Sequence, residues 1–196
     1  MFIAGMTGSG KSTLATEIAR RWDRVLIYDP KDDPNAWIPN AAVCYGVKAA
    51  RAALPGRVLY RPLPSENSRV SQLFDELAKI VFRATAHAIV IHEMGDLAET
   101  DRDVGTWLAA CFRQGRSRRI PMIACTQRPV NVPYMSMSEA NHFAAFTLLA
   151  PTDRKLLGGW MGPEVVAAPL PASEHRFWYR SPDLSLVRMP PLTLHR

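Results

Sequence analysis

The stretch that decides the fold is GMTGSGKST, residues 5–13, which follows the short apolar segment MFIA and opens a helical segment. It fits the pattern G-x-x-x-x-G-K-[ST], with Gly5, Gly10, Lys11 and Ser12 in the specified positions. The glycines let the backbone curl so that several N–H groups point at one phosphate, and the helix N-terminus adds partial positive charge. The sequence therefore predicts a phosphate-binding loop.

The residue types in this loop also predict which groups bind the nucleotide. The Lys11 side chain would reach the β- and γ-phosphates, and the Ser12 hydroxyl would ligate Mg²⁺. The alternative, a Gly-rich loop that binds nothing, is disfavoured because the loop lies between a strand and a helix, where the chemistry requires it. The expected ligands are ATP and Mg²⁺. The expected nucleotide-binding residues are Gly5, Thr7, Gly8, Ser9, Gly10, Lys11, Ser12 and Thr13.

Apolar segments alternate with helical segments through most of the chain. Four apolar segments read as buried strands: RVLIYDP (24–30), HAIVIHE (87–93), IPMIACTQ (120–127) and NHFAAFTLL (141–149). Three segments have a helical pattern: SRVSQLFDELAKIVFRAT (68–85), DRDVGTWLAACFRQG (101–115) and APTDRKLLGG (150–159). Strands that are apolar throughout and alternate with helices predict a parallel sheet covered on both faces.

Length and composition are those of one soluble domain. The chain has 196 residues, of which 47% are hydrophobic and 21% charged. We expect a single domain over residues 1–196, with residues 163–196 a Pro-rich C-terminal extension of short strands. No apolar run approaches the roughly 20 residues of a membrane span, and the start does not resemble a signal peptide. Three cysteines without a CxxC pair predict reduced, partly buried thiols in a cytosolic compartment.

The net charge of +6 is unevenly distributed. Residues 1–110 carry 13 basic and 13 acidic side chains, whereas residues 111–196 carry 11 basic and 5 acidic ones. A basic half suggests a polyanionic partner such as nucleic acid. A soluble surface that is simply rich in arginine explains the charge equally well.

The stretch AIVIHEMGDL, residues 88–97, is an apolar strand that ends in His92 and Glu93. In a P-loop enzyme this strand tip faces the γ-phosphate, and a Glu there can orient and activate the attacking water. The residue before it is normally an Asp that holds the Mg²⁺ shell. Neutral imidazole is a poorer partner for Mg²⁺, yet His92 can accept a hydrogen bond from a metal-bound water. We expect hydrolysis with a weakened or pH-sensitive metal shell, with Asp96 as an alternative carboxylate.

A second polar strand tip lies in IPMIACTQRP, residues 120–129, where Thr126 and Gln127 end the apolar run. In the additional-strand class of P-loop ATPases, such a strand lies between the P-loop strand and the Glu strand. Its polar tip residue then contacts the γ-phosphate and senses hydrolysis. Small nucleotide kinases of similar length do not usually carry this feature. The expected fold is therefore α/β: a RecA-like, additional-strand P-loop NTPase with a mainly parallel sheet flanked by helices.

Taken together, these motifs resemble the HerA–FtsK superfamily of DNA-pumping ATPases over about residues 1–162. Besides the P-loop, the chain shares an Asp-Pro-Lys turn, an Asp-Glu-x-x-Asp-Leu pattern in which His92 replaces the first Asp, and a Thr-Gln-Arg-Pro element. The matching segments are GMTGSGKST, LIYDPKDD, IVIHEMGDL, GRSRRIPMIACTQRPVNVP and NHFAAFTLLAPTDRKLLG. The Thr-Gln-Arg-Pro element is the most discriminating of them.

The resemblance implies a Mg-dependent ATPase in which Glu93 is the catalytic base and Gln127 the sensor. It also implies a ring-shaped homo-oligomer, a hexamer or pentamer, with ATP at subunit interfaces and double-stranded DNA through the centre. Arg116 falls where the family keeps an arginine that reaches the γ-phosphate of the neighbouring subunit. Three nearby arginines are alternatives for that role: Arg113, Arg118 and Arg119.

A motor domain of this size, without membrane spans or extra domains, resembles the genome-packaging ATPases of icosahedral viruses with an internal membrane. That subtype implies a translocase in the host cytoplasm or at the packaging vertex of the virion, with capsid or viral membrane proteins as partners. Alternatives are another DNA pump for plasmid transfer or chromosome segregation, a small-molecule kinase, and a P-loop subunit that no longer hydrolyses nucleotide. The expected DNA contacts, by phosphate-binding side chains in loops, are Arg61, Arg69 and Arg128.

Overall fold

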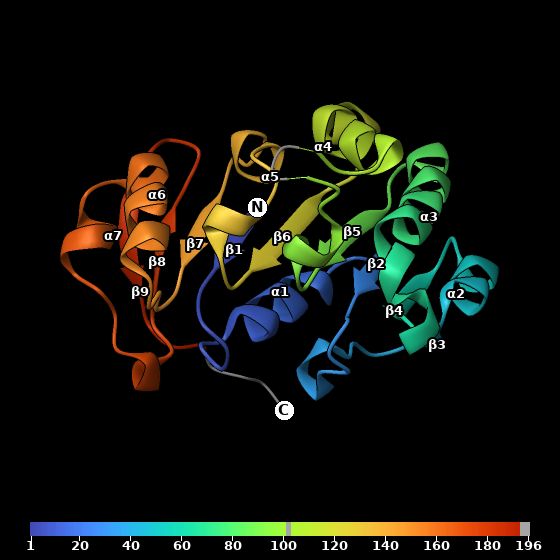
Figure 1. Cartoon of the computed structure of the whole chain (residues 1–196), viewed down its shortest axis with the longest axis horizontal. Coiled ribbons are helices and arrows are strands. Elements are labelled where there is room, and N and C mark those ends of the chain that lie inside the picture. The colour runs from blue at the N-terminus through green and yellow to red at the C-terminus, as the bar shows by residue number, and fades with distance from the viewer. Residues whose placement is uncertain (101–102, 193–196) are drawn as a thin grey trace.

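The computed structural model describes residues 1–100 and 103–192, and the described residues build one nine-stranded sheet (Figure 1). The strand order is β3-β4-β2-β5-β6-β1-β7-β8-β9, and every neighbouring pair from β3 to β7 is parallel. The strands are β1 (Phe2–Ala4), β2 (Val25–Tyr28), β3 (Ala42–Tyr45), β4 (Arg57–Arg61), β5 (Ala88–Ile91), β6 (Met122–Thr126), β7 (Phe143–Ala145), β8 (Phe177–Arg180) and β9 (Leu186–Met189).

The helices cover both faces of the sheet, and each face has its own apolar core. Successive strand residues point to opposite faces, so Phe2 packs in the core under α3, α4 and α6, whereas Ile3 packs in the core under α1. The helices are α1 (Lys11–Ala19), α2 (Val47–Ala53), α3 (Val70–Ala84), α4 (Thr106–Arg118), α5 (Met135–Ser138), α6 (Pro151–Met161) and α7 (Glu164–Ala167). The predicted parallel sheet with helices on both faces is confirmed.

Strand β6 lies between β1 and β5, as the additional-strand class requires. Because β1, β2, β5 and β6 are parallel, their carboxyl ends meet at one edge of the sheet. Gly5, Asp29, Glu93 and Gln127 follow those ends in the chain, and the Gly5 amide donates to the Thr126 carbonyl at 3.2 Å. The topology thus brings together the segments that the sequence motifs marked.

The C-terminal extension joins the same sheet. Strand β8 pairs antiparallel with β7, and β9 pairs antiparallel with β8 at the end of the sheet. The extension is less strand-rich than predicted, because it also contains α7 and a short 3₁₀ helix over Ala172–Glu174. Residues 193–196 of the predicted extension, and the first two residues of the predicted helix at 101–115, lie outside the described residues.

Two predictions about the chain as a whole can be checked directly. Cys44, Cys111 and Cys125 are free and buried, which confirms the buried thiols. Among the described residues, no helix has the length and hydropathy needed to span a bilayer.

The buried His87, just before β5, makes the stability of the fold depend on pH. It is 0% exposed, and burial, helped by the nearby Arg24 charge, lowers its pKa from 6.5 to about 4. Between those pH values the unfolded chain binds the proton and the folded chain does not, so the free energy of unfolding falls as the pH falls. We expect protonation of His87 to lower the free energy of unfolding near pH 4 by up to ~3 kcal/mol relative to pH 7.

The measurement is urea unfolding of the wild type and of His87→Leu at pH 7 and at pH 4.5. The difference in unfolding free energy between the two pH values should be smaller in the variant, because leucine cannot take up a proton. An equal difference in both proteins would contradict the role of His87.

Candidate active site

The loop between β1 and α1 has the backbone that its sequence predicts. Gly8 and Gly10 have φ values of 75° and 109°, in the left-handed region that favours glycine. A Cβ on Gly5 would lie 2.6 Å from the Cβ of Phe146, so a larger residue would not fit there. The loop opens into a cavity of about 340 Å³, whose lining includes Gly8, Gly10, Lys11, Ser12 and Thr13.

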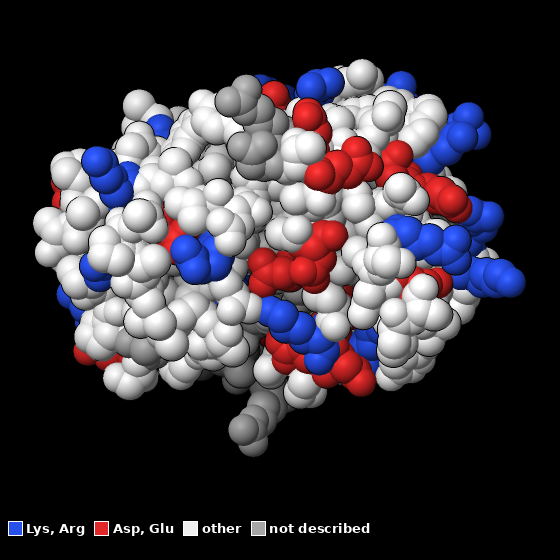
Figure 2. All heavy atoms as spheres, viewed as in Figure 1, with Lys and Arg blue, Asp and Glu red and all other residues white. Residues whose placement is uncertain are grey.

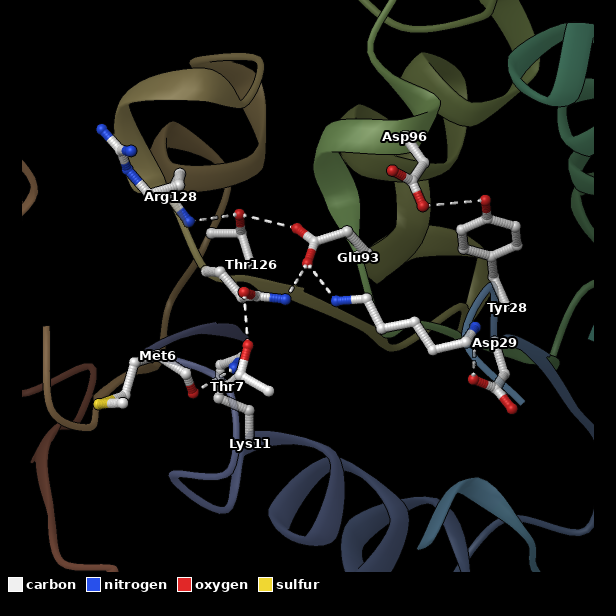
Figure 3. A network of polar contacts seen from close by, with 11 residues as sticks. Met6, Thr7, Lys11, Tyr28, Asp29, Glu93, Asp96, Thr126 and Arg128 are labelled. Carbon is white, nitrogen blue, oxygen red and sulfur yellow. Dashed lines mark hydrogen bonds and ion pairs between the residues drawn. The ribbon is translucent and has the colours of Figure 1, made fainter. Parts of the chain in front are cut away.

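The Lys11 ammonium is held inside this loop. It is 7% exposed and donates to the Met6 carbonyl at 2.9 Å (Figure 3). Burial lowers the pKa of Lys11, and Glu93 partly offsets that effect. A triphosphate that enters the loop would replace the Met6 carbonyl as the partner of this ammonium.

Glu93 lies at the centre of a hydrogen-bond network that joins three strand ends (Figure 3). The Thr126 hydroxyl donates to Glu93 Oε1 at 3.1 Å, and Gln127 Nε2 donates to Glu93 Oε2 at 3.2 Å. The hydroxyl of Thr7, in the phosphate-binding loop, donates to Gln127 Oε1 at 2.7 Å. Gln127 is therefore a bridge between the loop and the acid predicted to activate water, a position in which it can respond to the phosphate.

Lys31 is a member of this network that the sequence motifs did not assign. Its Nζ lies 3.2 Å from Glu93 Oε2, and its side chain is 52% exposed. Because Lys31 is half-exposed, its side chain can turn to the solvent and leave Glu93 free when a water molecule and a phosphate arrive. The available signal was the Asp-Pro-Lys turn after β2, which the sequence analysis named as a shared feature without assigning Lys31 a contact.

His92 occupies the place of the usual metal-shell Asp. It is 7% exposed, and both its ring nitrogens are buried without a hydrogen-bond partner among the described residues. Burial lowers the pKa of His92, an effect only partly offset by Asp29 and Asp33. This shift favours the neutral imidazole at physiological pH, and the weakened or pH-sensitive metal shell stays a prediction.

These groups fit Mg²⁺ bound mainly through other ligands. No cluster of three His, Cys, Asp or Glu side chains suited to a metal ion occurs within residues 1–100 and 103–192. Mg²⁺ would therefore be held by the Ser12 hydroxyl, by phosphate oxygens and by water, and the unpartnered ring of His92 can accept a hydrogen bond from such a water. The Asp96 carboxylate accepts a hydrogen bond from the Tyr28 hydroxyl at 3.3 Å (Figure 3), and its role as the alternative carboxylate stays a prediction.

The structure argues against one of the three predicted DNA contacts. The Arg61 side chain is only 12% exposed, and its Nε donates to the buried Asp29 carboxylate at 3.0 Å. It also pairs with Asp32 and reaches the Asp33 carbonyl. Arg61 thus holds the turn that carries Lys31, and its charge is not available to a DNA phosphate.

The other two predicted DNA contacts differ in their surroundings. Arg69 is exposed at the end of the 3₁₀ helix over Pro64–Arg69. Arg128 is 54% exposed, but its Nε donates to the buried Asp153 carboxylate at 2.8 Å. Both stay predictions, and Arg128 could contact DNA only with the part of its guanidinium that Asp153 leaves free.

Arg116 lies far from the phosphate loop of its own chain. It is exposed near the end of α4 and lines a groove of about 1170 Å³ together with Met1 and Met122, which stand at the amino ends of β1 and β6. Gln127 follows the carboxyl end of β6, so Arg116 is separated from the active site by the length of that strand, roughly 15 Å. Any action of Arg116 on a γ-phosphate must therefore occur in another copy of the chain.

The structure also separates the alternatives to Arg116. Arg118 donates to the Phe82 carbonyl at 3.3 Å and lies over the Phe82 ring, so it is a packing residue of α3 and α4. Arg113 and Arg119 are exposed and line the same groove as Arg116. Arg113, Arg116 and Arg119 therefore remain as candidates for the arginine that reaches the γ-phosphate of a neighbouring subunit.

The face of the molecule seen in Figure 2 carries both acidic and basic side chains. Figure 2 shows acidic side chains gathered in the middle of the visible face, with basic ones beside them and around the rim. Arg113, Arg116 and Arg119 of the basic C-terminal part are instead grouped at the amino edge of the sheet. Part of the excess positive charge of residues 111–196 therefore lies at the amino edge of the sheet, on the surface that carries Arg116.

The strand order, the loop at the carboxyl end of β1 and the Glu93–Gln127 pair define the P-loop NTPase fold of the additional-strand class. The chain is similar to the DNA packaging ATPase P9 of Enterobacteria phage PRD1, with 31% identity over 120 residues, which are 57% of this chain and 46% of P9. It therefore spans about half the length of that curated relative. No family model matches the chain.

Solved structures with the same fold point in the same direction. The genome packaging NTPase B204 of Sulfolobus turreted icosahedral virus 2, in complex with AMPPCP, has a TM-score of 0.73 at 13% identity, over 98% of this chain and 97% of B204. The conjugation coupling protein TcpA of pCW3 has a TM-score of 0.55 at 12% identity, over 97% of this chain and 59% of TcpA. The similarity to a DNA packaging ATPase thus rests on P9, and these structures show that the chain shares their fold.

Proposed function

We propose that the chain is an ATP-driven translocase of double-stranded DNA that packages a viral genome. The observation that carries this proposal is the bridge from Thr7 through Gln127 to Glu93, because it connects the phosphate-binding loop with a water-activating acid. The similarity to P9 of phage PRD1 supports genome packaging as the use of this chemistry. DNA and capsid or viral membrane proteins would be the partners, in the host cytoplasm or at the packaging vertex.

The residues divide the work of hydrolysis between them. Lys11 holds the β- and γ-phosphates, and Glu93 accepts a hydrogen bond from the attacking water and orients it toward the γ-phosphate. Gln127 contacts the γ-phosphate and loses that contact after cleavage, so its bonds to Thr7 and Glu93 can report the change. Mg²⁺, when bound beside Ser12, would neutralise the charge of the phosphate oxygens.

A ring of identical subunits would complete the active site. Arg116 cannot reach its own phosphate loop, but a heterologous contact that closes into a ring would bring it to the γ-phosphate of the neighbouring copy. A hexamer or a pentamer meets this requirement. Double-stranded DNA would pass through the centre, where Arg69 and the free part of Arg128 would contact its phosphates.

Two other functions are less well supported. A small-molecule kinase would need an acceptor pocket and an Arg-rich lid, and it has no use for Gln127 between the loop and Glu93. A pump for plasmid transfer is favoured only by the fold shared with TcpA, which is more distant than that shared with B204. Neither alternative accounts for the similarity to P9 of phage PRD1.

The experiment that tests the function is the ATPase rate of protein of known oligomeric state, with and without double-stranded DNA. We expect Mg²⁺-dependent turnover by the assembled ring, with stimulation by DNA that weakens as the salt concentration rises. Turnover by lone subunits that is indifferent to DNA, or no turnover at all, would contradict the proposal.

Replacing His92 by Asp should strengthen Mg²⁺ binding. A carboxylate is a better partner than imidazole for metal-bound water, so we expect the Mg²⁺ concentration that gives half-maximal ATPase to fall by about tenfold in His92→Asp. The matched control is His92→Asn, which offers a neutral oxygen and should stay near the wild type. If neither the wild type nor His92→Asp turns over ATP in the presence of DNA, a structural role without hydrolysis is favoured.

A further inference from the structure

The cavity at the phosphate loop has a second wall, which no sequence motif marks. Beyond the loop residues, its lining comes from Phe146 after β7, from Asp33 and Asn35 at the 3₁₀ helix over Pro34–Ala36, and from the C-terminal extension. The extension contributes His175, Pro191 and Leu192.

This part of the extension is attached to the phosphate loop. His175 Nδ1 lies 3.4 Å from the Ser9 carbonyl. The Phe177 ring packs on the Phe146 ring with 4.8 Å between their centroids, and Leu192 packs against the core cluster under α1. The second wall is therefore held in place by contacts on both sides of the loop.

The two ends of the cavity suit different parts of one ligand. Glycine amides, Lys11 and Ser12 fit phosphates, whereas Pro191 and Leu192 offer apolar surface, with the polar ring of His175 beside them. Apolar walls with a few polar groups are the usual surroundings of a flat heteroaromatic ring, and about 340 Å³ is within the range of small-molecule sites.

We propose that the nucleobase of the bound triphosphate lies against the C-terminal extension, in the part of the cavity lined by His175, Pro191 and Leu192. The proposal rests on the proposed function only in requiring that the loop binds a nucleoside triphosphate. It gives the extension a specific role, since segments about 165 residues apart in the chain then hold the two ends of one nucleotide. It also assigns base contact to a segment outside the P-loop motif.

The test compares two ligands on the full chain. Titration calorimetry gives Kd for ATP and for inorganic tripolyphosphate, which has the phosphates but no base, in the wild type, His175→Ala and Leu192→Ala. We expect Kd for ATP to rise by about tenfold in each variant, whereas Kd for tripolyphosphate should stay within about twofold of the wild-type value. Leu184→Ala is the matched control, because Leu184 is 66% exposed in the turn between β8 and β9 and should change neither Kd.

Several outcomes would overturn the proposal. One is an unchanged ATP affinity in both variants, and another is an equal loss for ATP and tripolyphosphate. A wild type that binds the two ligands equally tightly would also overturn it, because the base would then contribute nothing. Failure of the proposed function is distinguishable, since it would appear as a wild type that binds neither ligand. Lys11→Ala should weaken the binding of ATP and of tripolyphosphate alike.

Discussion

Glu93→Gln is expected to abolish turnover while leaving ATP binding intact. The amide keeps the shape of the carboxylate and can still accept from the Thr126 hydroxyl, but it is too weak a base to deprotonate a water molecule. Loss of a general base typically lowers a rate by about 10²–10⁴-fold. Glu93 does not line the cavity that holds the phosphates, so Kd for ATP should change little. Steady-state ATPase and titration calorimetry on the same protein measure the two effects.

Asp96→Asn is the matched control for this variant. Asp96 lies three residues after Glu93, and Asp96→Asn likewise replaces a carboxylate by an amide. The hydrogen-bond partner of Asp96, however, is the Tyr28 hydroxyl. Burial raises the pKa of Asp96, and the nearby Glu93 charge adds to that effect, so a neutral side chain is well tolerated there. Turnover should survive in Asp96→Asn. Persistence of turnover in Glu93→Gln would show that another group activates the water.

The loss of one charge should affect the fold only slightly. The charge partner of Glu93 is the half-exposed Lys31, whose ammonium the solvent can hydrate in place of Glu93, and the new amide keeps an oxygen for the Thr126 hydroxyl. The melting temperature of Glu93→Gln should therefore stay close to that of the wild type. A large drop would indicate that the carboxylate stabilises the network through Thr126 and Gln127 more than it serves catalysis.

The sheet was predictable because its strands are apolar on both faces. Continuous runs such as AIVI and MIACT read as buried parallel strands without further information, and β6 was placed between β1 and β5 by its polar tip. Short strands in the extension were predicted too, but α7 was missed. Its four residues, Glu164–Ala167, are too few to show a helical period.

Side-chain contacts between distant segments were the part that the sequence did not reveal. Arg61 reads as a loop arginine, and only the folded chain shows that it neutralises the buried Asp29 carboxylate. Lys31 reads as one charge in a charged turn, yet it reaches Glu93. Both contacts depend on the register of β2 against β4 and β5, which pairs Tyr28 with Tyr60 and Ile91. Residue patterns within one segment carry no information on that register.

Arg116→Ala is expected to have the largest effect on turnover. An arginine that reaches the γ-phosphate from a neighbouring subunit is worth roughly 10³–10⁵ in rate. The Arg116 side chain makes no hydrogen bond or ion pair within the part of the chain that the structure describes, so its loss should change the free energy of unfolding by less than about 0.5 kcal/mol. Arg113→Ala and Arg119→Ala are matched controls from the same groove and should keep most of the activity.

A mixing experiment separates action in trans from action in cis. Arg116→Ala has an intact Glu93 but no arginine to offer its neighbour, whereas Glu93→Gln offers the arginine but has no base. If the arginine acts between subunits, rings assembled from both inactive proteins regain activity wherever a Glu93 site faces an intact Arg116. In an equal mixture that arrangement occurs at about one interface in four.

No regain is possible if Arg116 serves its own subunit, because every site would then lack one of the two groups. The position of Arg116 at the amino edge of the sheet, with β6 between it and Gln127, predicts the regain. A mixture that stays inactive under conditions where wild-type subunits exchange would exclude Arg116 as the trans residue. The same mixture made with Arg113→Ala or Arg119→Ala would then identify which arginine takes its place.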